Sequence, residues 1–135
     1  MWQGHDGLPG SVAGTVERRH GLPSPPMSSP SLPLLITAGE PAGIGPDLCV
    51  MLAQSVDHSP PPGGLVFLAD HDVLRSRAAQ LGLPFTLPDY QPGQHQPVSV
   101  LHLPVAVPVH AGHLDAGNGA YVLDTLRRAA ACASP

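Results

Sequence analysis

The sequence predicts an α/β fold with an open, mostly parallel sheet, and three observations lead to this prediction. A short aliphatic run, Leu34–Thr37, is followed by a glycine-rich turn and then by a helical pattern. A second run, Leu65–Ala69, is continuously apolar, as in parallel strands that are covered on both faces. It is also followed by a helical pattern, and this order of strands and helices implies right-handed crossovers.

Length and composition restrict the possible classes of protein. A chain of 135 residues forms one domain at most. The net charge is −4 and the six basic residues, all arginine, form no cluster, which argues against a nucleic-acid partner. No apolar run approaches the ~20 residues that span a bilayer, and the N-terminus lacks the features of a secretory signal. We therefore expect a cytoplasmic protein without a membrane partner.

Residues 1–33 are rich in proline, serine and glycine and are predicted to be a disordered extension. The predicted α/β segment is residues 34–135. Met27 lies shortly before the first strand, so translation starts either at Met1, with a flexible tail, or at Met27. The mass of the natively expressed protein distinguishes the two, and a peptide that contains Trp2 would refute a start at Met27.

The first helix is predicted over residues 46–54. Pro46 suits the first helical position, and Asp47 places a negative charge near the helix N-terminus. Leu48, Met51 and Leu52 share one face of this helix and are its predicted apolar face.

The second helix is predicted over His71–Leu81, with Asp70 as its N-cap. Its apolar stripe is Leu74, Ala78 and Leu81, while Arg75 points outward. Gly82, followed by a proline at position 84, ends the helix.

The remaining elements are less regular. Residues 85–87 are predicted as a short edge strand, residues 89–97 as a loop and residues 98–103 as a strand. Residues 105–107 lie between two prolines and are expected to be extended. A last helix is predicted from Asn118 or Gly119 to Cys132, with an apolar stripe of Val122, Leu126 and Ala129 or Ala130.

The turn after the first strand is the candidate ligand loop. Its glycines have the spacing G-x-x-x-G-x-G, which is neither the dinucleotide fingerprint nor a Walker motif, and the chain contains no lysine. The candidate residues are Gly39, Glu40, Gly43, Gly45 and Asp47. The alternative is a tight turn that requires a glycine with positive φ. Glu40 lies where open α/β sheets bind ligands, or it hydrogen-bonds to the backbone of its own loop.

No catalytic residue and no metal ligand is predicted. His110 and His113 flank Gly112 close to a proline, so a shared helical face is not expected there. His71 and His102 show no partner pattern. No Gly-x-Ser-x-Gly motif is present, and Cys49 and Cys132 are interpreted as buried apolar residues rather than as nucleophiles or a disulfide.

Two motifs resemble one enzyme family. Residues 37–47, Thr-x-Gly-Glu-Pro-Ala-Gly-Ile-Gly-Pro-Asp, resemble the N-terminal signature of the 4-hydroxythreonine-4-phosphate dehydrogenases, NAD-dependent enzymes of pyridoxal 5′-phosphate biosynthesis. Residues 112–122 resemble its Gly-x-Leu-x-x-x-Asn-Gly-x-Tyr-Val pattern, and Leu-Gly-Leu-Pro at 81–84 also matches. The resemblance covers the N-terminal portion of the family only. It implies a partial three-layer sheet of the isocitrate and isopropylmalate dehydrogenase-like architecture.

The resemblance also implies a reaction. Family members oxidise and decarboxylate 4-phosphooxy-L-threonine, a small phosphorylated amino acid, with NAD or NADP and a divalent metal (Zn, Mg or Co). Their metal ligands are histidines from two subunits of a homodimer, and they lie downstream of the matched segments. This chain is therefore expected to hold neither group, to be inactive alone and to expose apolar surface.

Two alternatives remain open. The chain could be part of a sister dehydrogenase of other four-carbon phosphorylated hydroxy acids, which substrate assays would reveal. It could instead be a non-catalytic α/β module that binds a phosphate-bearing ligand or a partner chain, which a partner captured by the intact chain would indicate. A downstream Thr-Gly-Pro stretch with spaced histidines would favour either enzyme over the module.

Overall fold

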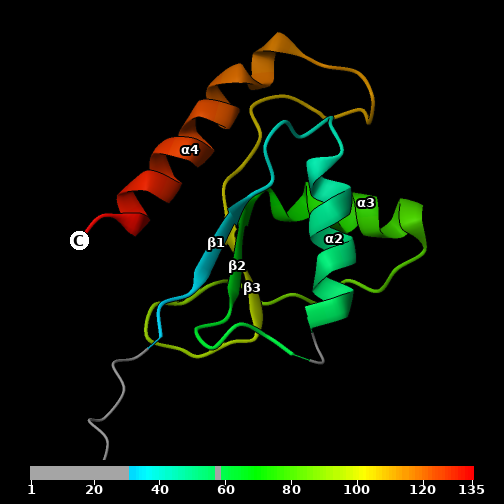
Figure 1. Ribbon diagram of the computed structural model, residues 1–135. Coiled ribbons are helices and arrows are strands. Elements are labelled where there is room, and N and C mark those ends of the chain that lie inside the picture. Colours follow the sequence, from blue (N-terminus) through cyan, green and yellow to red (C-terminus); the bar gives the residue numbers. More distant parts are fainter. Residues whose placement is uncertain (1–30, 57–58) are drawn as a thin grey trace, which may run out of the picture.

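The computed structural model describes residues 31–56 and 59–135, and it forms an α/β unit (Figure 1). The predictions about the N-terminal extension and the start of translation concern residues 1–30, which lie outside the described residues. In chain order the elements are β1 (Leu34–Thr37), α2 (Gly45–Val56), β2 (Leu65–Ala69), α3 (His71–Leu81), β3 (Val98–His102), the short 3-10 helix η2 (Ala116–Asn118) and α4 (Gly119–Ala133).

The three strands form a parallel sheet, as the sequence predicts, and the structure places them in the order β1-β2-β3. The central strand β2 is buried throughout, and Phe67 and Leu68 are completely inaccessible. Helices α2 and α3 pack against each other on one face of the sheet, while α4 contacts β1 and β2 on the other face (Figure 1). The described residues therefore form three layers, with a parallel sheet between two helical layers.

The ends of α3 confirm the sequence prediction. The Asp70 side chain accepts hydrogen bonds from the backbone N–H groups of Asp72 (2.8 Å) and Val73 (3.3 Å), which is N-cap geometry. Gly82 ends the helix with φ +69°, and its N–H group donates to carbonyls of the last turn. Asp70 thus fixes where α3 begins, at the carboxyl end of β2.

The predicted apolar face of α2 is wrong. The face packed on the sheet consists of Cys49, Val50 and Ala53, each at most 4% exposed. Leu48 and Met51 are 52% and 53% exposed. Because α2 is apolar on both sides, its periodicity does not identify the inner face, and the small side chains pack closest to the sheet.

Three other burial predictions also need correction. Leu81, predicted in the stripe of α3, is 42% exposed, although Leu74 and Ala78 are buried as expected. In α4 the buried residues are Tyr121 and Thr125, whereas Leu126 is 53% exposed. The inner face of α4 thus carries two polar side chains: the Tyr121 hydroxyl accepts a hydrogen bond from Asp70 N, and the Thr125 hydroxyl donates to Val122 O of the same helix. Cys132 is exposed near the C-terminus of the same helix, while Cys49 is buried, and both thiols are free.

Residues 85–87 form no strand. Pairing with β3 occurs just after this segment, at an isolated bridge between Asp89 and Val100, where Tyr90 N donates to Val100 O (2.8 Å) and Val100 N donates to Pro88 O (2.9 Å). Pro84 and Pro88 flank the segment and have no N–H group for a sheet ladder. Phe85 instead packs against the hydrophobic core. Within the described residues, no helix is long and apolar enough to cross a bilayer.

Candidate functional site

The candidate loop leaves the carboxyl end of β1 and enters α2 through a tight turn. Gly39 has φ +74°, a conformation that strains any other L-residue, and the Gly43 N–H group donates to Glu40 O (3.0 Å). At Gly45 an added Cβ would lie 1.8 Å from Ala38 O. Glycine at position 45 is therefore required because the first turn of α2 passes directly against the end of β1.

Glu40 contributes to this turn. One of its carboxylate oxygens accepts a hydrogen bond from Ala42 N at 3.2 Å. Of the two interpretations left open by the sequence, the structure thus shows the bond between Glu40 and the backbone of its own loop. The bond holds the carboxylate beside the turn.

A buried arginine from α3 holds the loop in place. Arg77 is 4% exposed, and its guanidinium donates to Pro41 O and Gly43 O, both at 3.0 Å. The same group pairs with Asp47 in the first turn of α2 at 2.9 Å. Arg77 therefore ties the loop and the N-terminus of α2 to the neighbouring helix, and it neutralises the only acidic side chain of α2.

The sequence prediction missed Arg77, although a signal for it exists. Val73, Leu74, Arg77 and Ala78 are the buried residues of α3, and their spacing defines one helical face. An arginine on the inner face of a helix must have partners, because a buried charge without them is costly. Its partners could not be predicted, since two are backbone carbonyls 34 and 36 residues away.

The segment after β3 closes the other side of the loop. The Gly112 N–H group donates to Ala42 O at 2.9 Å. The Asp70 carboxylate accepts from Val105 N at 2.8 Å, in addition to capping α3. Asn118 is 2% exposed, and its carbonyl oxygen accepts from Ala106 N (3.0 Å) and Val107 N (3.1 Å). Asp70 and Asn118 thus fix the segment that lies against the candidate loop.

Tyr121 lies beneath this edge of the sheet. Its hydroxyl oxygen accepts a hydrogen bond from Asp70 N at 3.0 Å, and the side chain is 5% exposed. Burial raises the pKa of the Tyr121 phenol to about 12, and the charges of Asp70, Cys49 and Glu40 act in the same direction, against the backbone hydrogen bond. Tyr121 is therefore a neutral phenol at physiological pH and supports the carboxyl end of β2.

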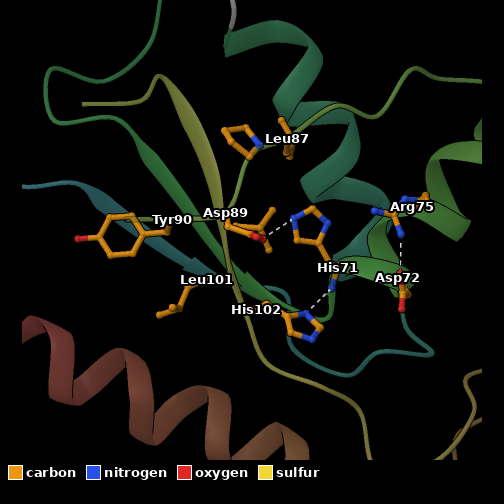
Figure 2. Close-up of a pocket in the computed structure, with 10 residues that line it drawn as sticks. His71, Asp72, Arg75, Leu87, Asp89, Tyr90, Leu101 and His102 are labelled. Atoms are coloured by element: carbon orange, nitrogen blue, oxygen red, sulfur yellow. Dashed lines mark hydrogen bonds and ion pairs between the residues drawn. The ribbon is translucent and has the colours of Figure 1, made fainter. Parts of the chain in front are cut away.

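An open hollow of about 640 Å³ lies beside β3, at the start of α3 (Figure 2). His71 Nε2 is 3.1 Å from a carboxylate oxygen of Asp89, and His71 N donates to His102 Nδ1 at 3.0 Å. Figure 2 shows both interactions. The sequence shows no partner pattern for these histidines, and the structure gives them the partners Asp89 and His71 N. The His102 ring thus adds a second hydrogen-bond acceptor, beside Asp70, at the N-terminus of α3.

Alkaline pH is expected to destabilise the fold through Cys49. Burial raises the pKa of this thiol from 9.0 to about 11. The unfolded chain then loses the proton at lower pH than the folded chain, so the free energy of unfolding falls as pH rises from 9.0 to about 11. We expect a loss of about 2 kcal/mol across this range, measured by urea denaturation. Cys49→Ala should remove this dependence below about pH 10, above which Tyr121, whose pKa is raised from 10.0 to about 12, contributes its own loss. A Cys49→Ala curve that falls equally below pH 10 would contradict the assignment.

The described residues do not provide a metal centre by themselves. No group of three His, Cys, Asp or Glu side chains among them is arranged to hold a metal ion. His110 and His113 face each other across a tight turn, in which His113 N donates to His110 O, rather than along a helix. The described part of the chain thus does not fit the divalent metal that the family resemblance implies.

Together, the loop and its supports are typical of the ligand-binding edge of an α/β protein. A glycine-rich turn leaves the carboxyl end of a parallel strand and leads into a helix N-terminus, where backbone N–H groups are available to an anion. The arrangement offers positioning and hydrogen bonding rather than a nucleophile.

Comparison with known proteins indicates which α/β proteins this chain resembles. No family model matches the chain. It is 48% identical over 101 residues to the 4-hydroxythreonine-4-phosphate dehydrogenase of Chromobacterium violaceum. The aligned region makes up 72% of this chain and 30% of that enzyme. The enzymes of the same name from Erwinia tasmaniensis (52% over 102 residues, 71% of this chain) and Vibrio cholerae (50% over 104 residues, 72%) are also each covered to 30%.

By sequence the chain is a relative of the 4-hydroxythreonine-4-phosphate dehydrogenases, which confirms the resemblance inferred from its motifs. The chain spans about 30% of the length of the curated relatives it matches.

Proposed function

We propose that this chain is the glycine-loop segment of a 4-hydroxythreonine-4-phosphate dehydrogenase. In the whole enzyme it would serve the NAD- or NADP-dependent oxidation and decarboxylation of 4-phosphooxy-L-threonine. The observation that carries the proposal is the 48–52% identity to three enzymes of that name over about 100 residues. The isocitrate and isopropylmalate dehydrogenase-like architecture, the homodimer and the cytoplasmic location are parts of the same proposal.

In this proposal the loop binds an anionic part of the substrate or cofactor. Gly39, Glu40, Gly43, Gly45 and Asp47 shape it, and the ligand meets backbone N–H groups at the N-terminus of α2. Arg77 supports this role because it pairs with Asp47, which would otherwise repel an anion. Since the guanidinium of Arg77 is occupied by Asp47 and two carbonyls, its role is to position the loop rather than to contact the ligand.

The metal and most of the nicotinamide site are assigned to other parts of the enzyme. The described residues do not fit a metal centre, so no step of the reaction is assigned to a metal held by them. The contribution of this chain is a preformed loop whose geometry is fixed by Gly45 and Arg77. A rigid site of this kind lowers the entropic cost of placing the substrate beside its reactant.

The 135-residue chain alone is expected to be inactive. The test is NADH or NADPH formation from 4-phosphooxy-L-threonine with Zn²⁺ or Mg²⁺, with the full-length Vibrio cholerae relative as positive control. A chimera in which residues 34–135 replace the matched segment of that relative is expected to be active. Activity that scales with the isolated chain would refute its inactivity, and a folded but inactive chimera would refute the proposed function.

A further inference from the structure

Helix α2 has a second apolar face that nothing covers in the described part of the chain. Ile44 precedes the helix by one residue, and Leu48, Met51 and Leu52 follow it at i+4, i+7 and i+8, which places all four on one side. We call these four residues the outer stripe. They are 68%, 52%, 53% and 37% exposed, while the opposite face of α2 is buried against the sheet.

The outer stripe has the chemistry of an interior surface. From Leu48 to Val56 the helix contains no charged residue, and the one acidic residue before them, Asp47, is paired with Arg77. A surface helix of a monomeric protein normally carries charged residues on its outer face, whereas a helix that is apolar all round is typical of the core of a larger protein. The stripe is therefore suited to contact with other polypeptide rather than with water.

A second helix exposes apolar residues in the opposite layer of the molecule. Leu123 and Leu126 of α4 are 52% and 53% exposed, and α4 lies on the other face of the sheet from α2 (Figure 1). A dimer formed through the outer stripe would leave these residues in water. The stripe itself belongs to a helix only about 18 Å long, which is short for a specific interface of about 800 Å² per partner. A partner that encloses the segment on both sides fits better.

We propose that the outer stripe is a docking surface for the remainder of a 4-hydroxythreonine-4-phosphate dehydrogenase. The inference rests on the proposed function and names the partner of this segment. The relatives contain enough additional polypeptide to cover the stripe, because about 70% of each lies outside the part that aligns with this chain. Burying Leu48, Met51 and Leu52 against that polypeptide gives α2 two covered faces.

The experiment is co-expression of the 135-residue chain with the Vibrio cholerae relative from which the matched residues have been deleted. A soluble complex is expected, detected by co-purification and by its mass. The double variant Leu48→Glu and Met51→Glu should weaken the complex at least about tenfold, because each change buries an unpaired charge. Leu114→Glu is the matched control, since Leu114 is 78% exposed and lies outside the stripe.

Several results would overturn the inference. The first is that the truncated Vibrio cholerae relative stays insoluble when it is co-expressed with the wild-type chain. The second is that the double variant binds the truncated relative as tightly as the wild-type chain does. The third is that the chain binds equally tightly to the intact relative, in which the relative's own segment already occupies the position. Self-association of this chain that the double variant abolishes would indicate a second copy as the occupant. If the double variant does not fold, Met51→Glu replaces it, with circular dichroism as the check.

The readout is complex formation rather than NADH production, so the result is separate from the test of function. A complex without dehydrogenase activity would uphold the docking surface and count against the proposed reaction. An active chimera, together with a complex whose affinity the double variant does not change, would support the proposed reaction and count against the docking surface.

Discussion

Arg77→Met is expected to lower the free energy of unfolding by about 3 kcal/mol, measured by urea denaturation. The substitution removes the guanidinium that donates to Pro41 O and Gly43 O and that pairs with Asp47. Those two carbonyls and one carboxylate then lose their charged partner in a position where Arg77 is 4% exposed. Methionine keeps much of the aliphatic bulk, so the loss reports the polar contacts rather than a cavity.

Arg75→Met is the matched control for Arg77→Met. Arg75 lies two residues earlier on the same helix, and its side chain is 60% exposed. It pairs with the exposed Asp72 and lies over the ring of Phe85, 5.8 Å from its centroid. Exposed pairs of this kind contribute little to stability, so we expect the free energy of unfolding to change by no more than about 0.5 kcal/mol. Equal losses in the two variants would show that Arg77 does not hold the loop.

Gly45→Ala is expected to be at least as damaging, with a loss of about 3 kcal/mol or more. The added Cβ would lie 1.8 Å from Ala38 O, and the contact is with backbone rather than with a flexible side chain. Either β1 or the first turn of α2 has to move, which displaces the candidate loop between them. In an active chimera, the same substitution should therefore lower kcat/KM under conditions where the protein is still folded.

Gly119→Ala is the control for Gly45→Ala. Gly119 begins α4 with helical dihedral angles (φ −60°, ψ −40°), and an added Cβ there meets nothing within 4 Å. Alanine restricts the unfolded chain more than glycine does, so this variant should be more stable by about 0.5 kcal/mol. A loss of stability in Gly119→Ala similar to that in Gly45→Ala would mean that the close approach of the added Cβ to Ala38 O does not explain the loss at position 45.

The sequence predicts the elements of this fold well because each has a local signal. Leu65–Ala69 is a continuous apolar run, and the structure has a strand with the same bounds. Asp70 and Gly82 supply a cap and a stop, and α3 begins and ends between them. These signals depend on a few neighbouring residues and need no knowledge of the tertiary packing.

The faces of the helices were less predictable, because they depend on what each helix packs against. In α2 both faces are apolar, and Cys49, Val50 and Ala53 lie inside only because small side chains bring the helix close to the sheet. In α4 the inner residues are Tyr121 and Thr125, which a hydrophobic stripe does not select. Tyr121 lies inside since its hydroxyl meets Asp70 N, a partner 51 residues away in the chain.

For the candidate site, the loop was predictable and its support was not. The glycine spacing and the position after a strand single out residues 39–47, and Glu40 bonds to its own loop as one of the two interpretations proposed. Arg77 escaped prediction because its partners are distant carbonyls. The hydrogen bond from Gly112 N to Ala42 O could not be predicted either, because it joins two backbone groups and does not depend on the residue types.

The bond between Asp70 N and Tyr121 has a consequence for the order in which the chain matures. The ribosome synthesises both strand–helix–strand units, β1-α2-β2 and β2-α3-β3, before Tyr121 of α4. Until then, the amide of Asp70 lacks its partner Tyr121, and Ala106 N and Val107 N lack the carbonyl oxygen of Asn118. We therefore expect assembly of the edge that carries the candidate loop to be the final folding event, completed when α4 docks onto a sheet that already exists.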